Sequence, residues 1–292
     1  MKKIIGIVGP TGVGKTQLSI ELAKKLDGEV INCDSTQVYK GLAIATAKVT
    51  EEEMEEIPHH LLSFQELEED YTVYDFQKDA RACIEDILKR GKTPILVGGT
   101  GLYLKAVLYD YQFEEQESTV RYNESNEELY ERILRLDPQT KIHKNNRRRM
   151  ERYLSYYDET GKKLNEKEKA KKIYDFCLIG LTTDRETLYE RINTRVDKML
   201  KQGLLKEAES LYKRNIRTKA VLTPIGYKEL FAYFEGNCSL EESIAKIKQS
   251  SRHYAKRQYT WFHHQMDVTW FSVSFKNFEE TVEEVYQYIT KI

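Results

Sequence analysis

The chain has 292 residues, enough for one large domain or for a core that carries an inserted lobe. Its 46 basic and 47 acidic residues leave a formal net charge of −1, which argues against a protein that coats nucleic acid with a uniformly basic surface. The four cysteines form no C-x-x-C pair, so a zinc ribbon or a thioredoxin-type redox site has no support. No apolar run approaches the roughly 20 residues of a membrane span, and no signal-peptide core follows the first residues; we therefore expect a cytoplasmic protein without a membrane segment.

The first hundred residues alternate between strand-like and helical patterns. Short apolar runs predict strands at residues 4–8, 29–33 and 94–97. A helix with Leu18, Leu22 and Leu26 on one face follows the first strand, and a longer amphipathic helix covers residues 74–89. Strands that alternate with helices predict an α/β fold with a parallel sheet covered on both faces.

The pattern changes between residues 112 and 172, where strand-like runs are missing and charged helical stretches occupy residues 126–136 and 147–157. This change predicts an all-helical lobe at 112–172, inserted into a core formed by residues 1–111 and 173–292. The core resumes with strand-like runs at 174–181 and 268–271 and a last helix near 279–289.

Residues 9–16 (GPTGVGKT) form a phosphate-binding motif. They match G-x-x-x-x-G-K-[ST] at every fixed position and lie between a strand and a helix, the context that the motif requires. Backbone N–H groups hold a phosphate group, the lysine adds positive charge and the threonine hydroxyl ligates Mg²⁺. The predicted diphosphate-binding residues are Gly9, Pro10, Thr11, Gly12, Val13, Gly14, Lys15 and Thr16. The motif indicates a di- or triphosphate group without identifying what is attached to it.

A carboxylate follows the second predicted strand instead of the third. The third strand ends in Gly98-Gly99-Thr100, where hydrolases of this type carry an acidic residue. Asp34 lies at the carboxyl end of the second strand, where ligands bind in open α/β sheets. Its position fits a metal ligand, a general base or a cap for the following loop.

Two basic blocks, at residues 141–152 and 246–257, indicate a local anion-binding surface in a neutral protein. Each is equally typical of a solvated helix face. The run 254–263 (YAKRQYTWFH) mixes basic and aromatic residues, as in surfaces that contact an RNA backbone and stack its bases. It also fits an amphipathic helix that buries Tyr254, Trp261 and Phe262. The adjacent pairs His59-His60 and His263-His264 are interpreted as surface or capping residues.

Taken together, spaced motifs along nearly the whole chain resemble the bacterial tRNA dimethylallyltransferases, also called tRNA isopentenyltransferases. These motifs are 9–16 (GPTGVGKT), 34–39 (DSTQVY), 98–103 (GGTGLY), 137–138 (DP) with 142–143 (IH), 195–200 (RVDKML) with 203–204 (GL), 225–229 (IGYKE), and 254–258 (YAKRQ) with 260–262 (TWF).

The resemblance implies a P-loop core like that of nucleotide kinases and a helical insertion that contacts the tRNA anticodon arm. Its implied activity is transfer of a dimethylallyl group from dimethylallyl diphosphate to N6 of the adenosine 3′-adjacent to the anticodon, by a monomer that uses Mg²⁺. Lys15, Thr16 and Arg195 are the implied diphosphate and metal contacts, and Asp34 is the implied general base. The implied tRNA-binding residues are Asp34, Ser35, Thr36, Gln37, Thr100, Arg121, Arg148, Arg149, Arg152, Gly226, Tyr227, Lys228, Lys256, Arg257, Gln258, Thr260 and Trp261.

Two other functions fit the same core. In a small-molecule or nucleotide kinase, Asp34 would activate a hydroxyl towards ATP. In a non-enzymatic RNA-binding switch, the loop would sense a nucleotide and change the affinity for RNA.

Overall fold

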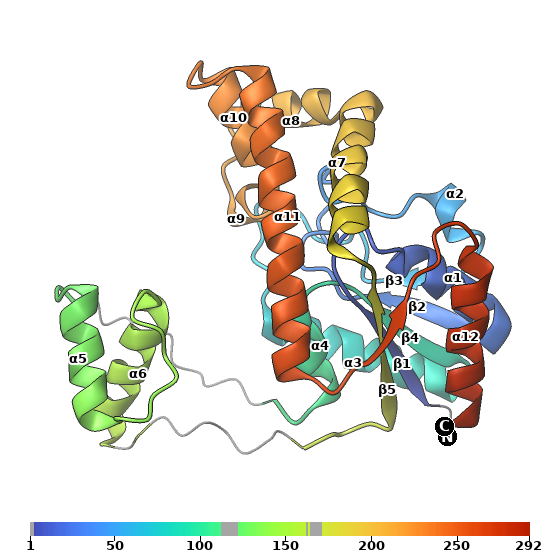
Figure 1. Ribbon diagram of the computed structural model, residues 1–292, viewed down its shortest axis with the longest axis horizontal. Helices are drawn as coiled ribbons and strands as arrows, with labels where there is room; N and C mark the ends of the chain where they lie inside the picture. Colours follow the sequence, from blue (N-terminus) through green and yellow to red (C-terminus); the bar gives the residue numbers. More distant parts are fainter. Residues whose placement is uncertain (1–2, 112–121, 162, 164–170) are drawn as a thin grey trace. The chain divides into compact units, whose positions relative to one another are not determined.

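The structure, a computed structural model, describes residues 3–111, 122–161, 163 and 171–292. Within these residues, six strands form one parallel sheet in the order β3-β2-β4-β1-β5-β6 (Figure 1). The strands are β1 (Ile4–Val8), β2 (Gly28–Asn32), β3 (His59–His60), β4 (Thr93–Val97), β5 (Phe176–Thr182) and β6 (Thr269–Ser272). The predicted α/β class with a parallel sheet is confirmed.

Helices cover both faces of the sheet. In β1, Ile5 and Ile7 belong to one buried cluster and Ile4 and Val8 to another, because neighbouring residues of a strand point to opposite faces. The covering helices are α1 (Lys15–Leu26) and α12 (Phe278–Lys291) on one face, and α3 (Val73–Lys89) and α4 (Gly101–Leu108) on the other. The two ends of the core lie together, since Lys3 Nζ donates to the backbone oxygen of Ile292 at 2.9 Å (Figure 1).

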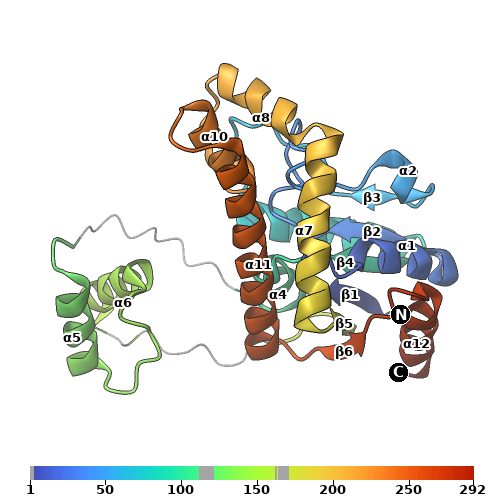
Figure 2. The ribbon, with the colours of Figure 1, turned by 45° about the horizontal axis from the view of Figure 1, so that its top comes forward.

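A second group of helices follows β5. Figure 2 shows α7 (Arg185–Gln202) and α11 (Leu240–Gln265) running side by side. Their ends pack with three shorter helices around a separate apolar cluster, which also takes in Val38 and Leu42 from the segment after β2. The other helices described in the core are α2 (Glu51–Met54), α8 (Leu204–Lys213), α9 (Lys219–Leu222) and α10 (Tyr227–Phe234).

The chain divides into two compact units, residues 1–111 with 172–292 and residues 112–171. The described part of the second unit contains α5 (Asn126–Leu136) and α6 (Arg147–Thr160), which pack through a small apolar cluster that includes Ile133 and Leu154. Arg147 begins α6 and ties it to the segment before α5, because its guanidinium donates to the backbone oxygen of Glu124 at 2.8 Å.

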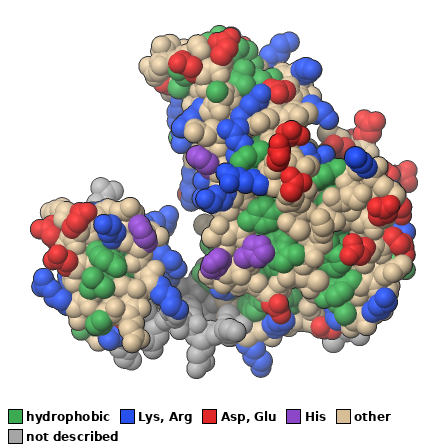
Figure 3. Space-filling view, viewed as in Figure 1, with side chains coloured by type: hydrophobic (Ala, Val, Ile, Leu, Met, Phe, Trp, Pro, Cys, Tyr) green, Lys and Arg blue, Asp and Glu red, His purple; other side chains and the backbone are tan. Residues whose placement is uncertain are grey.

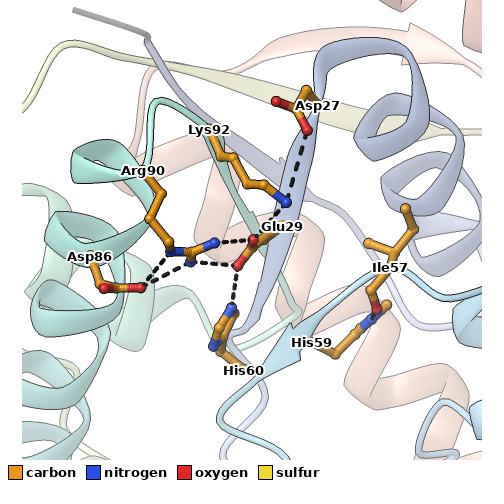
Figure 4. Close-up of polar contacts among 8 residues, drawn as sticks. All are labelled: Asp27, Glu29, Ile57, His59, His60, Asp86, Arg90 and Lys92. Atoms are coloured by element: carbon orange, nitrogen blue, oxygen red, sulfur yellow. Dashed lines mark hydrogen bonds and ion pairs between the residues drawn. The ribbon is translucent and has the colours of Figure 1, made fainter.

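A buried carboxylate joins β2 to its neighbours at the amino end of the strand (Figure 4). The Glu29 side chain is 3% exposed and pairs with Arg90, with Lys92 at 3.1 Å and with His60 Nε2 at 2.8 Å. Hydrogen bonding from the Arg90 guanidinium, helped by His60 and Lys92, holds the pKa of Glu29 well below its usual range against the effect of burial. The carboxylate is therefore charged and fully paired.

Strand β3 was not expected from the sequence. His59 and His60 pair with Val30 and Ile31, and a run of two residues is too short to show a strand period. The two rings diverge, because His60 faces Glu29 while His59 Nδ1 lies 2.8 Å from the backbone oxygen of Ile57 (Figure 4). Among the described residues, no group of three His, Cys, Asp or Glu could hold a metal ion. Every helix that the structure describes is too short or too polar to cross a lipid bilayer.

Candidate active site

The loop between β1 and α1 presents donors for an anion. Gly14 precedes α1 with φ 103°, a left-handed conformation that favours glycine. The turn brings the unpaired N–H groups of the first helical turn to the loop, where they can hold a phosphate group. Lys15 Nζ donates to the backbone oxygens of Gly9 at 3.0 Å and Pro10 at 2.8 Å, so the ammonium lies over the same loop.

Two arginines of α7 add positive charge to this loop. Arg195 Nη1 donates to Thr11 Oγ1 at 3.1 Å, and Arg191 Nε donates to the backbone oxygen of Gly12 at 3.0 Å. Burial, together with the Arg195 charge and partly offset by Asp34, lowers the pKa of Lys15 to about 7. Within the described chain neither Lys15 nor Arg195 forms an ion pair with a carboxylate, so their charges are available to a multiply charged anion.

The phosphate-binding loop opens into a cavity of about 1080 Å³. One side is formed by the loop and α1, another by α7, and a third by the segment after β2. Tyr254 and Gln258 of α11 and the Gly98-Gly99 turn complete the lining. Apolar side chains, among them Ile20, Ile44, Val49 and Met199, share the cavity with the charged groups. A ligand with an anionic end and an apolar end fits this mixture.

Asp34 lines the cavity just past the end of β2. Its Oδ1 accepts hydrogen bonds from the Thr36 backbone N at 2.9 Å and from Thr36 Oγ1 at 2.6 Å. Its Oδ2 accepts none within the described parts of the chain. One oxygen therefore caps the following turn, which is one of the three predicted roles, and the other is left for a ligand or a proton.

Helix α11 brings two polar side chains to the same place. Gln258 Oε1 accepts from the Thr11 backbone N at 2.9 Å, and its Nε2 donates to the Gly99 backbone oxygen at 3.1 Å. Burial, together with the Asp34 charge and partly offset by a hydrogen bond with Thr100, raises the pKa of Tyr254 to about 12. The motifs around residues 9–16, 34–39, 98–103 and 254–258, far apart in the sequence, thus meet at one cavity.

The cavity offers ligands suited to Mg²⁺. Thr16 Oγ1 lines it and has no hydrogen-bond partner among the described residues, and Asp34 Oδ2 adds a second free oxygen. Mg²⁺ prefers oxygen ligands and keeps several waters, so one or two protein oxygens together with a diphosphate suffice. The residues fit the ion.

Most of the predicted tRNA-binding residues lie where a macromolecule could reach them. Figure 3 shows Lys, Arg and His side chains gathered over α11, on the face of the core seen in Figure 1. Ser35, Thr36, Gln37, Thr100 and Trp261 are half-buried around the cavity or next to it. The exposed members are Arg148, Arg149, Arg152, Lys228, Lys256, Arg257 and Thr260. Arg121 lies outside the described residues.

Three predicted tRNA-binding residues lie inside the protein instead. Tyr227 is 0% exposed, Gln258 is 5% exposed and Gly226 is buried. These three residues have almost no exposed surface in this conformation, and their contact with tRNA stays a prediction. Gln258 instead links the phosphate-binding loop to the Gly98-Gly99 turn. The alternative interpretation of run 254–263 is correct in part, because Phe262 is fully buried while Lys256 and Arg257 are exposed.

Several site residues were missed by the sequence analysis. Arg191 lies next to the predicted Arg195, one helical turn earlier, and that spacing could have identified it. Lys48 lines the cavity, and burial lowers its pKa to about 8 against the effect of Glu207. Nothing in the local sequence around Lys48 or Glu207 indicates these positions.

A scan against protein-family models matches residues 37–265 to the family described as IPP transferase. A curated tRNA dimethylallyltransferase from Anoxybacillus flavithermus is 51% identical over 299 residues, which cover 99% of this chain and 96% of that protein. The enzyme of the same name from Geobacillus thermodenitrificans is 48% identical, with 99% and 96% covered.

Solved structures agree. A crystal structure of a tRNA delta(2)-isopentenylpyrophosphate transferase from Staphylococcus epidermidis superposes with a TM-score of 0.77 at 42% identity and covers all of both chains. A eukaryotic dimethylallyltransferase, described as acting on tRNA, has a TM-score of 0.81 at 34% identity, with 98% of this chain and 77% of that one covered.

Proposed function

Because the chain belongs to the IPP transferase family of tRNA dimethylallyltransferases, we propose that it transfers a dimethylallyl group from dimethylallyl diphosphate to N6 of the adenosine 3′-adjacent to the anticodon of tRNA. The observation that carries the proposal is the cavity itself. It combines an anion-binding loop, apolar side chains and a carboxylate with one oxygen that no described residue pairs. The same comparisons disfavour the kinase alternative, because the relatives are named as prenyl transferases.

The reaction needs help at the leaving group. The C1–O bond of the allylic diphosphate breaks, and the electron pair leaves with the diphosphate while positive charge spreads over the allyl group. Donors that face this growing negative charge lower the barrier most. Lys15, Arg195 and the backbone N–H groups of the loop are these donors. When bound by Thr16, Mg²⁺ would neutralise part of the diphosphate charge.

The nucleophile needs a proton acceptor. As the lone pair of the adenine N6 forms the new bond to C1, the amine must release one proton. Asp34 Oδ2 has no partner among the residues that the structure describes and Asp34 lines the same cavity as the loop, so it is the group that we assign to this step. Thr100 and Tyr254 lie beside Asp34 and would border the adenine.

The target base must leave the stack of the anticodon loop to reach the cavity. Unstacking costs a few kcal/mol, which contacts to the RNA backbone offset. The exposed Lys256 and Arg257 on α11 and Arg148 and Arg149 on α6 are proposed for these contacts. We also propose that the protein acts as a monomer, since one chain supplies every catalytic group named above. The proposed location is the cytoplasm.

Titration calorimetry tests the proposal. The purified protein with Mg²⁺ should bind a non-hydrolysable thiolo analogue of dimethylallyl diphosphate, and inorganic pyrophosphate should compete with it. Lys15→Ala should abolish both signals. Binding of ATP in preference to the allylic analogue, with transfer of its γ-phosphate to any acceptor, would support the kinase alternative instead.

A further inference from the structure

We infer that Glu207 is a positioning residue that fixes the wall of the cavity against which the prenyl group binds. The wall loop is defined here as residues 43–49, most of which line the cavity. The inference rests on the proposed function, because it assigns the prenyl group to this cavity. Glu207 itself belongs to α8 and does not line the cavity.

The Glu207 carboxylate collects backbone donors from the start of the wall loop. It accepts from the N–H groups of Ala43 at 3.0 Å, Ile44 at 2.9 Å and Ala45 at 3.1 Å. The Tyr227 hydroxyl donates to its Oε1 at 2.7 Å. Three successive N–H groups that converge on one carboxylate behave like the first turn of a helix capped by an anion. Here the cap comes from a residue more than 150 positions away.

The rest of the wall loop is held by contacts within its own segment of the chain. Lys48 N donates to the Ala43 backbone oxygen at 3.0 Å, which closes the turn. Gln37 Nε2 donates to the Thr46 backbone oxygen at 3.0 Å, and Lys48 Nζ donates to the Tyr39 backbone oxygen at 2.6 Å. All of these partners lie in the segment after β2 itself. Glu207 is therefore the hydrogen-bonding anchor of the loop to the helical part of the core.

Two glycines make the close approach possible. Gly226 has φ 130° and ψ −54°, which side-chain-bearing residues rarely adopt, and a Cβ atom there would lie 3.4 Å from the Ala45 Cβ atom. Gly203, with φ 107°, forms the turn between α7 and α8 next to Ile44. The motifs at 203–204 and 225–227 thus serve the wall loop, and this explains why Gly226 and Tyr227 are buried.

Helices α7 and α8 contact both ends of the proposed substrate site, the phosphate-binding loop and the wall loop. Arg195 of α7 contacts the phosphate-binding loop, and Met199 and Gln202, farther along α7, line the cavity. After Gly203 the chain turns, and Glu207 follows within the first turns of α8. The distance between the diphosphate site and the apolar wall is therefore set by α7, the Gly203 turn and the Glu207 contact. Loosening the contact should move the wall while leaving the RNA-facing surface of α11 in place.

Steady-state kinetics of Glu207→Gln with both substrates tests the inference. Glutamine keeps one acceptor oxygen but loses the charge and the second oxygen. We expect the KM for dimethylallyl diphosphate to rise about tenfold, while the KM for tRNA stays within about twofold. Discrimination against the longer geranyl diphosphate should fall as well. Tyr227→Phe, which removes one donor and leaves the three backbone contacts, should give a smaller rise of about two- to threefold.

The matched control is Glu209→Gln on the same helix. Its carboxylate pairs with Lys213 at 2.7 Å and is 46% exposed, so both KM values should stay unchanged. A smaller folded fraction would lower the apparent kcat and leave both KM values unchanged, so the KM values are the readout; an unchanged KM for dimethylallyl diphosphate in the folded variant would overturn the inference. Should Glu207→Gln fail to fold, Tyr227→Phe carries the same test. If the wild-type protein forms no prenylated tRNA, the proposed function fails; if it does and the variants match it, the inference alone fails.

Discussion

Strand β2 has an acidic residue near each end, and the two differ in how completely their carboxylates are paired. Glu29 at the amino end is buried and paired with Arg90, Lys92 and His60 (Figure 4). Asp34, just past the carboxyl end, keeps one oxygen without a partner in the cavity. The cations show the same contrast, because Arg90 faces carboxylates while Arg195 bonds only the neutral Thr11 hydroxyl among the described residues.

The comparison distinguishes charged residues that stabilise the fold from charged residues that take part in the reaction. A buried charge that is fully paired holds elements together and has no capacity left for a ligand. A charge that is desolvated but unpaired destabilises the free protein and gains its partner when substrate binds. We therefore expect changes around Asp34 to affect turnover and changes around Glu29 to affect folding.

The largest effect should follow Asp34→Asn. The amide can still accept from Thr36 but cannot take the proton of the adenine amine. The single-turnover rate should fall about 10²–10⁴-fold, the range of general-base catalysis, while tRNA affinity and the thermal midpoint change little. Rapid-quench measurement of product with saturating substrates checks the rate. Near-normal product formation would remove Asp34 from the base role.

Arg195→Ala should come next. It removes one donor that faces the departing diphosphate, and loss of such a donor costs about 2.7–4 kcal/mol, or roughly 10²–10³-fold in kcat. Because Arg195 forms no ion pair within the described chain, the free energy of unfolding should hardly change. Measurement of kcat checks the expected loss of turnover, and urea unfolding checks that the free energy of unfolding is unchanged. A large loss of stability with normal turnover would mean that Arg195, like Arg90, stabilises the fold and does not act in the reaction.

Glu29→Gln should show the reverse pattern. We expect the free energy of unfolding to fall by about 2 kcal/mol at neutral pH, since hydrogen bonds to a charged group are lost while the partners remain partly exposed. Turnover per folded molecule should be unchanged.

The pH dependence of this effect has a defined sign. The pKa of Glu29 in the folded protein is lowered, so its pairing stabilises the fold at pH values above the unfolded pKa of about 4.3 and is lost as pH falls through the lower folded value. Unfolding curves of the wild-type protein and Glu29→Gln should therefore converge in acid. A difference that persists in acid, or grows, would contradict the assignment.

Deprotonation of Lys15 in the wild-type protein should give the smallest of these effects near neutral pH. Its pKa is lowered to about 7, so the free protein loses this positive charge between about pH 6 and 8. The affinity for pyrophosphate should weaken towards about tenfold per pH unit above that range. Lys15→Arg, which stays charged, should show a flatter profile. Parallel profiles for the two proteins would mean that Lys15 remains protonated throughout.

Much of the core could be predicted from sequence because local patterns determine it. The apolar run at 4–8, the stripe of α3 and the complete motif at 9–16 each specify a structure within a few residues. The helices predicted at 126–136 and 147–157 follow from the same periodicity, and the second continues to Thr160 in the structure.

The features that the sequence did not predict depend on contacts between residues far apart in the chain. Strand β3 exists only because β2 lies beside it, and Gln258 is recognisable as a link only when it meets Thr11, 247 positions earlier. Basic and aromatic composition suggested a surface role for the run that contains Gln258, and the family resemblance implied one for Tyr227, while packing decided that both are buried. The Glu207 contact with Ala43 spans 164 positions and leaves no local pattern.

The central claim is that the cavity around Lys15 and Asp34 joins a prenyl group to an RNA amine. Mass spectrometry of the nucleosides of tRNA, after incubation with the purified wild-type protein, dimethylallyl diphosphate and Mg²⁺, tests it most directly. We expect N6-dimethylallyladenosine, with one pyrophosphate released per modified nucleoside, and no product without the allylic diphosphate. Unmodified tRNA under these conditions, or phosphate transferred from added ATP, would contradict it.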